Sequence, residues 1–328
     1  MSLLQPARRE RGIFLNPVPT VLTRPGTLLK SIKGFFTAPS GGTPDKPPGP
    51  FHTDAALYDS PPAGGLRVTW MGHSTLLLEI DEKRILTDPV WSGHASPVPI
   101  FAKRFFPPTL PLEKLPHLDL VLLSHDHYDH LDAPTIRKLA RTSVPFVCSL
   151  GVGSHLVRWG VSRNRITELD WTRHTSLGDL TITALPARHF SGRFRRNRTL
   201  WSSFAIRGPR HSVFYGGDSG PFTEGFHEIG EAYGPFDLTM LEIGAYGPYW
   251  PEIHMGPTFA AEGHQALRGN VLLPIHWGLF NLAYHHWREP VELILQEAEQ
   301  RSIKLLLPRP GEPVEVNGQD YISQWWEG

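Results

Sequence analysis

The chain is poor in cysteine, with one residue, Cys148, among 328. A single cysteine excludes an intramolecular disulfide and is compatible with a reducing compartment. Cys148 lies in the apolar run VPFVCSL, which indicates a small buried side chain rather than a reactive thiol.

Long apolar runs are also missing. No stretch approaches the roughly 18–20 apolar residues of a membrane-spanning helix. The first residues, MSLLQPARRERG, have neither the apolar centre nor the small-residue cleavage site of a secretory signal. We therefore expect a cytoplasmic protein with at most peripheral membrane contact.

An excess of charge of one sign is absent as well. The chain has 32 Lys and Arg against 32 Asp and Glu, so its formal net charge is zero. A chain without net charge has no long-range electrostatic field that would attract nucleic acid, and we expect no nucleic-acid partner.

Proline and glycine gather near the beginning of the chain. The stretches NPVPT, TAPSGGTPDKPPGP and DSPPAGG predict loops and extended segments. Between them, TLLKSIKGFF has the apolar spacing of a short helix that docks on the main domain, with a membrane-touching amphipathic segment as the alternative. Strand-like and helix-like patterns then mix to the end. We expect an N-terminal extension, residues 1–64, wrapped on one α/β (α+β) domain, residues 65–328.

Histidine, by contrast, is abundant, with 17 residues. In LVLLSHDHYDHLD an apolar, strand-like run leads directly into metal-ligand residues, and the runs LTITALPAR, SVFYGG and NVLLPI do the same. Because strand ends of one sheet can meet at one edge, we expect these side chains to lie together. They are His125, His127, Asp129, His130, His189, Asp218 and His276.

The residue types indicate a metal site, because neutral imidazoles and carboxylates suit zinc and other borderline divalent ions. His125 and His127 can face one ion, while Asp129 and His130 can turn towards a second. Seven ligands exceed the four of a tetrahedral ion but suit two ions that share a carboxylate and hold a hydroxide between them. We expect two divalent ions, with Zn²⁺ favoured over Mn²⁺ or Fe²⁺.

This pattern resembles the metallo-β-lactamase-fold hydrolases. The resemblance implies a four-layered αββα sandwich with both metals at one edge. It implies that His125, His127 and His189 bind the first ion. Asp129, His130 and His276 would bind the second ion, and Asp218 would bridge the two.

A closer resemblance covers about residues 13–313. The motifs FLNPVPT, VTWMGHSTLLLEIDEKRILTDPVW, SHDHYDHLD, GGDSG, GPFDLTMLEIGAY and PIHWGLF are similar to the N-acyl-phosphatidylethanolamine-hydrolysing phospholipase D family. This resemblance implies a phosphodiesterase that releases an N-acylethanolamine and phosphatidic acid, with a metal-bridging hydroxide attacking phosphorus. The expected partner is a small-molecule or lipid phosphodiester.

The loop RHFSGRFRRNR surrounds His189 with arginines, which bind phosphate oxygens bidentately. It predicts an anionic, phosphorylated substrate, with Arg193 and Arg188 as the substrate-binding residues. His254 resembles a site histidine of the lipid family and would stabilise the leaving oxygen or relay a proton, while Asp129 would steer the attacking hydroxide.

His73 and Asp88 follow strand-like runs and are expected behind the ligands, since metal-bound imidazoles donate their second N–H to a carboxylate or carbonyl. Two alternatives stay open. The same hydroxide attacking a carbonyl would give a lactonase or ester hydrolase, and a metal-binding scaffold would have no activity. The sequence specifies no oligomeric state.

Overall fold

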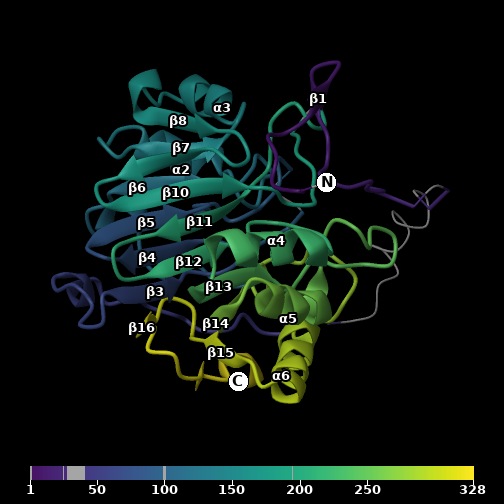
Figure 1. The fold of residues 1–328 in the computed structure, drawn as a ribbon. Coiled ribbons are helices and arrows are strands. Elements are labelled where there is room, and N and C mark those ends of the chain that lie inside the picture. Colours follow the sequence, from purple (N-terminus) through teal and green to yellow (C-terminus); the bar gives the residue numbers. More distant parts are fainter. Residues whose placement is uncertain (1, 25, 28–40, 99–100, 194) are drawn as a thin grey trace.

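The computed structural model describes residues 2–24, 26–27, 41–98, 101–193 and 195–328. Two large β-sheets pack face to face, and helices cover their outer sides (Figure 1). This architecture confirms the expected αββα sandwich. The helix expected within residues 27–36 lies almost wholly outside the described residues.

The first sheet contains seven strands in the order β16-β3-β4-β5-β6-β7-β8. Strands β3, β4 and β5 form an antiparallel meander, and β5 to β8 run parallel. Their bounds are β3 (Leu66–Trp70), β4 (Leu76–Ile80), β5 (Lys83–Thr87), β6 (Leu120–Leu123), β7 (Phe146–Ser149), β8 (Ile166–Leu169) and β16 (Pro313–Glu315).

Strand β6 illustrates why this sheet lies inside the protein. Leu120 and Leu122 pack into the core between the sheets, whereas Val121 and Leu123 pack outwards. The outward cluster includes Ile136 of α2 (Ala133–Leu139) and Leu156 of α3 (Gly153–Arg158). Successive strand side chains point to opposite faces, so a strand apolar at every position requires cover on both sides. Cys148 belongs to this outward cluster, as the sequence predicted.

The second sheet contains eight strands in the order β17-β15-β14-β13-β12-β11-β10-β9. Strands β12 to β15 are parallel, and β10 runs in the same direction because two antiparallel pairings separate it from β12. The bounds are β9 (His174–Leu177), β10 (Leu180–Leu185), β11 (Ser203–Arg207), β12 (Ser212–Tyr215), β13 (Phe236–Glu242), β14 (Gly269–Ile275), β15 (Lys304–Leu307) and β17 (Tyr321–Ile322).

Three helices lie along the outer side of this second sheet (Figure 1): α4 (Thr223–Tyr233), α5 (Gly256–Ala266) and α6 (Glu289–Arg301). Among the described residues, short 3-10 helices occupy three connections, η1 (Ala55–Tyr58), η2 (Leu112–Lys114) and η3 (Arg163–Arg165), and a fourth, η4 (Trp325–Glu327), follows the last strand. Among the described residues, no helix combines the length and apolar character needed to cross a membrane.

The N-terminal segment forms a small hairpin, β1 (Arg9–Glu10) and β2 (Ile13–Phe14), and then contacts the main domain. The Asn16 side chain donates to the carbonyl of His189 at 2.7 Å and accepts from its backbone N–H at 2.9 Å. Two hydrogen bonds to one residue fix the backbone of that residue. The segment therefore contributes directly to the position of His189.

Candidate metal centre

Four parallel strand ends deliver the candidate ligands to one edge of the sandwich. His125 follows β6 closely, and His189, Asp218 and His276 come after β10, β12 and β14. The last three strands share a direction within the second sheet, so their carboxyl ends meet at one edge. The structure brings together all seven side chains that the sequence singled out.

Unusual backbone conformations concentrate at this edge. His73, Asp88 and His276 have φ values of 55°, 32° and 63°, a region that residues other than glycine rarely adopt. Gly217 turns the chain just before Asp218 with φ of 57°, and a Cβ there would lie 2.8 Å from the Cβ of Ser124. Glycine is required at this turn because of both its dihedral angle and its close contact.

The first group of ligand atoms surrounds His127. Its Nδ1 lies 2.9 Å from Nε2 of His125 and 3.2 Å from Nε2 of His189. The carboxylate of Asp218 completes the group, with Oδ2 at 3.7 Å from His125 Nε2 and 3.5 Å from His189 Nε2. Burial lowers the pKa of all three imidazoles, so they are neutral, which is the form that binds a metal.

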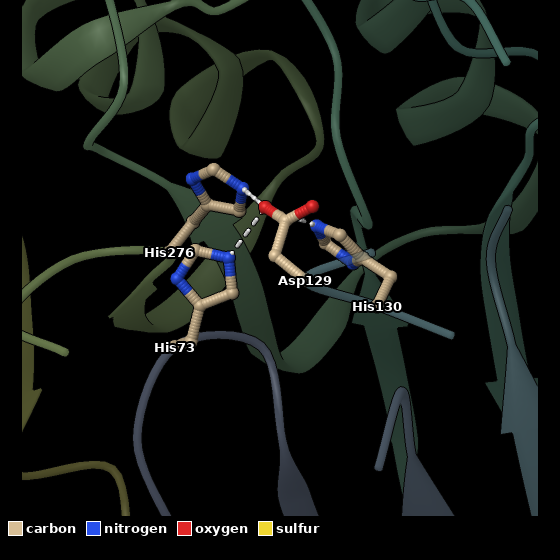
Figure 2. A group of neighbouring side chains, drawn as sticks. All are labelled: His73, Asp129, His130 and His276. Carbon is tan, nitrogen blue, oxygen red and sulfur yellow. Dashed lines mark hydrogen bonds and ion pairs between the residues drawn. The ribbon is translucent and has the colours of Figure 1, made fainter. Parts of the chain in front are cut away.

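The second group gathers around Asp129 (Figure 2). Its Oδ2 lies 2.9 Å from His73 Nε2, 3.2 Å from His276 Nε2 and 3.5 Å from His130 Nε2. Asp218 reaches this group too, with Oδ1 at 3.1 Å from His130 and Oδ2 at 3.2 Å from His276. Asp218 thus lies between the two groups, where a bridging ligand would be needed.

The charges of this second group differ from those of the first. Burial opposes protonation of His276, but the carboxylates of Asp218 and Asp129 outweigh it and raise the pKa to about 10. Asp218 and Asp129 likewise hold the pKa of His130 well above its ordinary value against the effect of burial. The two carboxylates therefore demand positive charge at this position, from protons or from a cation.

Several buried polar atoms here have no hydrogen-bond partner among the described residues: Nε2 of His130, Nε2 of His276 and Oδ1 of Asp218. Leaving such atoms unpaired is costly, about 1–3 kcal/mol each. These atoms lie close to one another, but their relative orientation does not allow hydrogen bonds between them. Nitrogen and oxygen atoms aimed at a common point match the donor set of a zinc-type ion, so these residues fit a metal.

Most ligand imidazoles are held from behind through their other nitrogen. Asp88 Oδ2 lies 2.7 Å from Nδ1 of His130 and accepts from Tyr215 at 2.6 Å. The Ile253 carbonyl accepts from Nδ1 of His189 at 2.8 Å. Asp88 therefore lies where the sequence predicted, behind a ligand. His73 contacts Asp129 directly, and burial lowers its pKa to about 3, so it is neutral there.

Glu242, at the end of β13, is a site residue that the sequence reasoning missed. The side chain is fully buried, and its Oε2 accepts from Nδ1 of His254 at 2.6 Å. Its Oε1 accepts from the backbone N–H groups of Ser219 and Met255 at 3.0 and 3.3 Å. Burial raises the pKa of Glu242. The sequence pattern that could have identified Glu242 is its position at the end of a strand-like run, LTMLE. This run lies in the sequence between the two runs that lead to Asp218 and His276.

A cavity of about 290 Å³, here called the ligand cavity, opens over the metal-ligand residues. Asp129, His127 and Asp218 line it together with His254, whose Nε2 is the ring nitrogen left for a bound molecule. Its other walls include residues of the N-terminal segment and one guanidinium, and they comprise Leu22, Thr23, Phe190, Arg196, Ala245, Trp250, Ile253 and Leu282.

The two arginines named from the sequence have other contacts. Arg188 forms an ion pair with Glu252 at 2.6 Å and donates to Thr20 Oγ1 at 3.0 Å. Arg193 donates to the carbonyls of Asp126 and Leu131 and stacks over Tyr128. Among the described residues that line the ligand cavity, the arginine is Arg196.

Comparison with known proteins agrees with this geometry. Residues 83–277 match the family model described as the beta-lactamase superfamily domain. The chain belongs to the beta-lactamase superfamily, and it is a metallo-hydrolase of that superfamily.

Three similar proteins show where the chain lies within the superfamily. The chain is 34% identical to an N-acyl-phosphatidylethanolamine-hydrolyzing phospholipase D of Caenorhabditis elegans, over 76% of this chain and 72% of that protein. It is 48% identical to an uncharacterised protein of Mycobacterium tuberculosis, over 80% of this chain and 72% of the relative. A metallo-hydrolase from Ignicoccus hospitalis superposes with a TM-score of 0.58 and 26% identity, covering 76% of this chain and 97% of that structure.

Proposed function

We propose that this chain hydrolyses phosphodiesters that carry an apolar chain, of the N-acylphosphatidylethanolamine type, at two divalent metal ions held by the seven ligands. His125, His127 and His189 would hold one ion and Asp129, His130 and His276 the other, with Asp218 shared. When bound, such ions polarise a phosphoryl oxygen and lower the pKa of a water molecule towards 7.

The observation that carries the proposal is the composition of the ligand cavity. Its lining includes Arg196, whose guanidinium lies over the Phe190 ring, and His254, together with Asp129 and Asp218. A guanidinium suits a phosphate oxygen, and an imidazole backed by a carboxylate suits proton transfer to a leaving oxygen. A neutral lactone would need neither a cation nor a proton donor at the cavity.

The reaction divides between these residues. Asp129 would orient the water whose oxygen forms the new bond to phosphorus. The bond from phosphorus to the alcohol oxygen breaks, and His254 would give that oxygen a proton. Glu242 would hold the imidazole in position and stabilise its charged form. The products are an alcohol and a phosphomonoester.

The apolar part of the substrate has a separate place. A groove of about 1110 Å³ is lined by Phe101, Phe105, Phe106, Ala95, Ala102 and Leu282, among others. Leu282 also lines the ligand cavity, so this side chain borders both spaces. Their proximity supports an acyl chain lying in the groove while its phosphodiester reaches Asp129 and His254.

A paired assay on protein of measured metal content tests the proposal. We expect turnover of bis(p-nitrophenyl) phosphate and of an N-acylphosphatidylethanolamine, and loss of both on chelation. A simple lactone should not be turned over. Lactone turnover without phosphodiester turnover would replace the phosphodiesterase by the lactonase alternative, and no turnover at full metal content would favour the scaffold.

A leaving-group comparison tests the role of His254. p-Nitrophenolate departs without protonation, whereas an alkoxide needs a proton. His254→Asn should therefore lower hydrolysis of the lipid far more than that of bis(p-nitrophenyl) phosphate. An equal loss on both substrates would contradict proton donation by His254.

A further inference from the structure

A second cavity, of about 560 Å³, lies on the other side of the metal-ligand loop, and we call it the arginine cavity. Asp126, between two ligand histidines, lines this cavity, whereas His127 and Asp129 line the ligand cavity. The arginine-rich loop after His189 contributes Arg193, Arg195 and Arg198 to the lining, so most arginines of that loop line this cavity and not the ligand cavity. The five arginines that line it are Arg9, Arg163, Arg193, Arg195 and Arg198.

The charge of this cavity is not balanced by the protein. Five arginines line it with two acidic residues, Asp126 and Glu168, an excess of three formal positive charges in a chain with a formal net charge of zero. Both carboxylates already have partners. Glu168 pairs with Arg163 at 2.6 Å and accepts from the N–H of Gly151 at 2.7 Å. Asp126 accepts from the N–H of Gly192 at 2.6 Å and contacts His155 at 3.2 Å.

Arg9 and Arg198 converge, and neither has an acidic partner in the described ranges. Nη2 of Arg9 and Nη1 of Arg198 both donate to the carbonyl oxygen of Gly12, at 3.4 and 3.3 Å. Within the part of the chain that the structure describes, no carboxylate is within 4 Å of the guanidinium nitrogens of Arg9, Arg195 or Arg198. Bringing like charges to one carbonyl is unfavourable, and an anion between them would relieve the repulsion.

We propose that the arginine cavity is a binding site for a phosphoryl anion, separate from the metal centre. Arg9, Arg195 and Arg198 would bind the anion, while Arg163 and Arg193 form the wall through their own contacts. Guanidinium groups bind the oxygens of a phosphate monoester in pairs. The site joins the N-terminal hairpin to the loop after His189, so occupation would hold two distant segments together.

The experiment measures pyrophosphate binding by calorimetry to the metal-loaded full chain at low salt. The test variant is the double substitution Arg195→Ala and Arg198→Ala, and Arg137→Ala, an exposed arginine of α2, is the matched control. We expect at least about tenfold weaker binding in the double variant and wild-type binding in the control. Equal affinity in the double variant and wild type would overturn the proposal.

Two further measurements separate this site from the metal centre and from a misfolded variant. Metal content, melting temperature and hydrolysis of bis(p-nitrophenyl) phosphate should be unchanged in the double variant. If hydrolysis fell with pyrophosphate binding, the anion would be bound at the metal centre and the second site would be excluded. Replacing both arginines by lysine should restore part of the affinity, because the charge is kept.

Vesicles distinguish the source of the phosphoryl group. Co-sedimentation with phosphatidylcholine vesicles that contain phosphatidic acid, lost in the double variant, would identify a lipid head group. Pyrophosphate binding without such co-sedimentation would identify a soluble phosphate. Absence of both would refute the site even where the proposed hydrolysis is confirmed.

Discussion

The ligand cavity and the arginine cavity flank the same loop, residues 125–130, yet they are built in different ways. On the ligand side, side chains come from strand ends, are mostly buried, and contact one another within 4 Å. On the arginine side, Arg9, Arg195 and Arg198 are exposed and come from loops and a two-residue strand. Rigid placement suits chemistry on a metal, whereas exposed cations suit reversible binding of an anion.

The difference also concerns protons. Protons compete with a metal ion for the imidazoles of His130 and His276, because Asp218 and Asp129 raise the pKa values of both side chains. Guanidinium groups keep their charge over the whole accessible pH range. Two sites separated by one loop should therefore respond very differently to pH and to single substitutions.

The largest effect should come from Asp218→Ala, which removes the carboxylate that both groups share. We expect a loss of hydrolysis of at least about 1000-fold together with lower metal content, because the imidazoles keep no bridging ligand. Pyrophosphate binding at the arginine cavity should persist. Metal analysis and steady-state kinetics check this, and full activity in the variant would refute the two-metal assignment.

Metal affinity should depend strongly on pH. In the metal-free chain His276 has a pKa of about 10, so below that value a metal must displace its proton. The affinity for the metal ion therefore falls as the pH falls, by about tenfold per pH unit for each proton released. Zinc titrations with a competing chelator at pH 8 and pH 6 should differ by roughly 100-fold or more. A flat zinc profile would contradict the coupled charges.

Glu242→Gln tests the buried carboxylate behind His254. The amide oxygen can still accept from Ser219 and Met255, but the negative charge beside Nδ1 of His254 is lost. We expect roughly 10- to 100-fold lower kcat on the lipid at unchanged metal content, and a smaller loss on p-nitrophenyl substrates. Glu231→Gln, an exposed glutamate of α4, is the control. An equal loss on both substrates would indicate that Glu242 has a structural role alone.

Arg196→Ala should have the smallest effect. Arg196 lines the ligand cavity, so its loss should raise KM for an anionic phosphodiester by about tenfold and leave kcat almost unchanged. Arg195→Ala is the control, since Arg195 lines the other cavity. Identical KM values for the two variants would show that the two sides of the loop are not separate.

Periodicity in the sequence predicted the mixed α/β class and the meeting of the seven candidate ligands, whereas the αββα sandwich was implied by the family resemblance. Strand ends carry their residues to one edge whatever the loops do, so His125, His189, Asp218 and His276 meet as expected. Asp88, which follows β5, lies 2.7 Å from Nδ1 of His130, and its role behind a metal ligand stays a prediction.

The arginines show where sequence reasoning stops. Proximity to His189 in the sequence suggested Arg193, but the direction of a loop side chain depends on tertiary contacts, and Arg193 stacks over Tyr128. Glu242 was overlooked because a glutamate after an apolar run could equally end at the surface. Only its burial and its bond to His254 reveal its place in the site.

The paired hydrogen bonds between Asn16 and His189 have a practical consequence for experiments with shortened chains. A fragment that begins at residue 65 would keep every ligand, yet it would lose the clamp on the third histidine and also Leu22 and Thr23 from the cavity wall. If such a fragment were inactive, the cause would be the loss of the hydrogen bonds that position His189, and not the loss of a candidate metal ligand. Expression trials should therefore retain the first 24 residues, even where they resemble a dispensable tail.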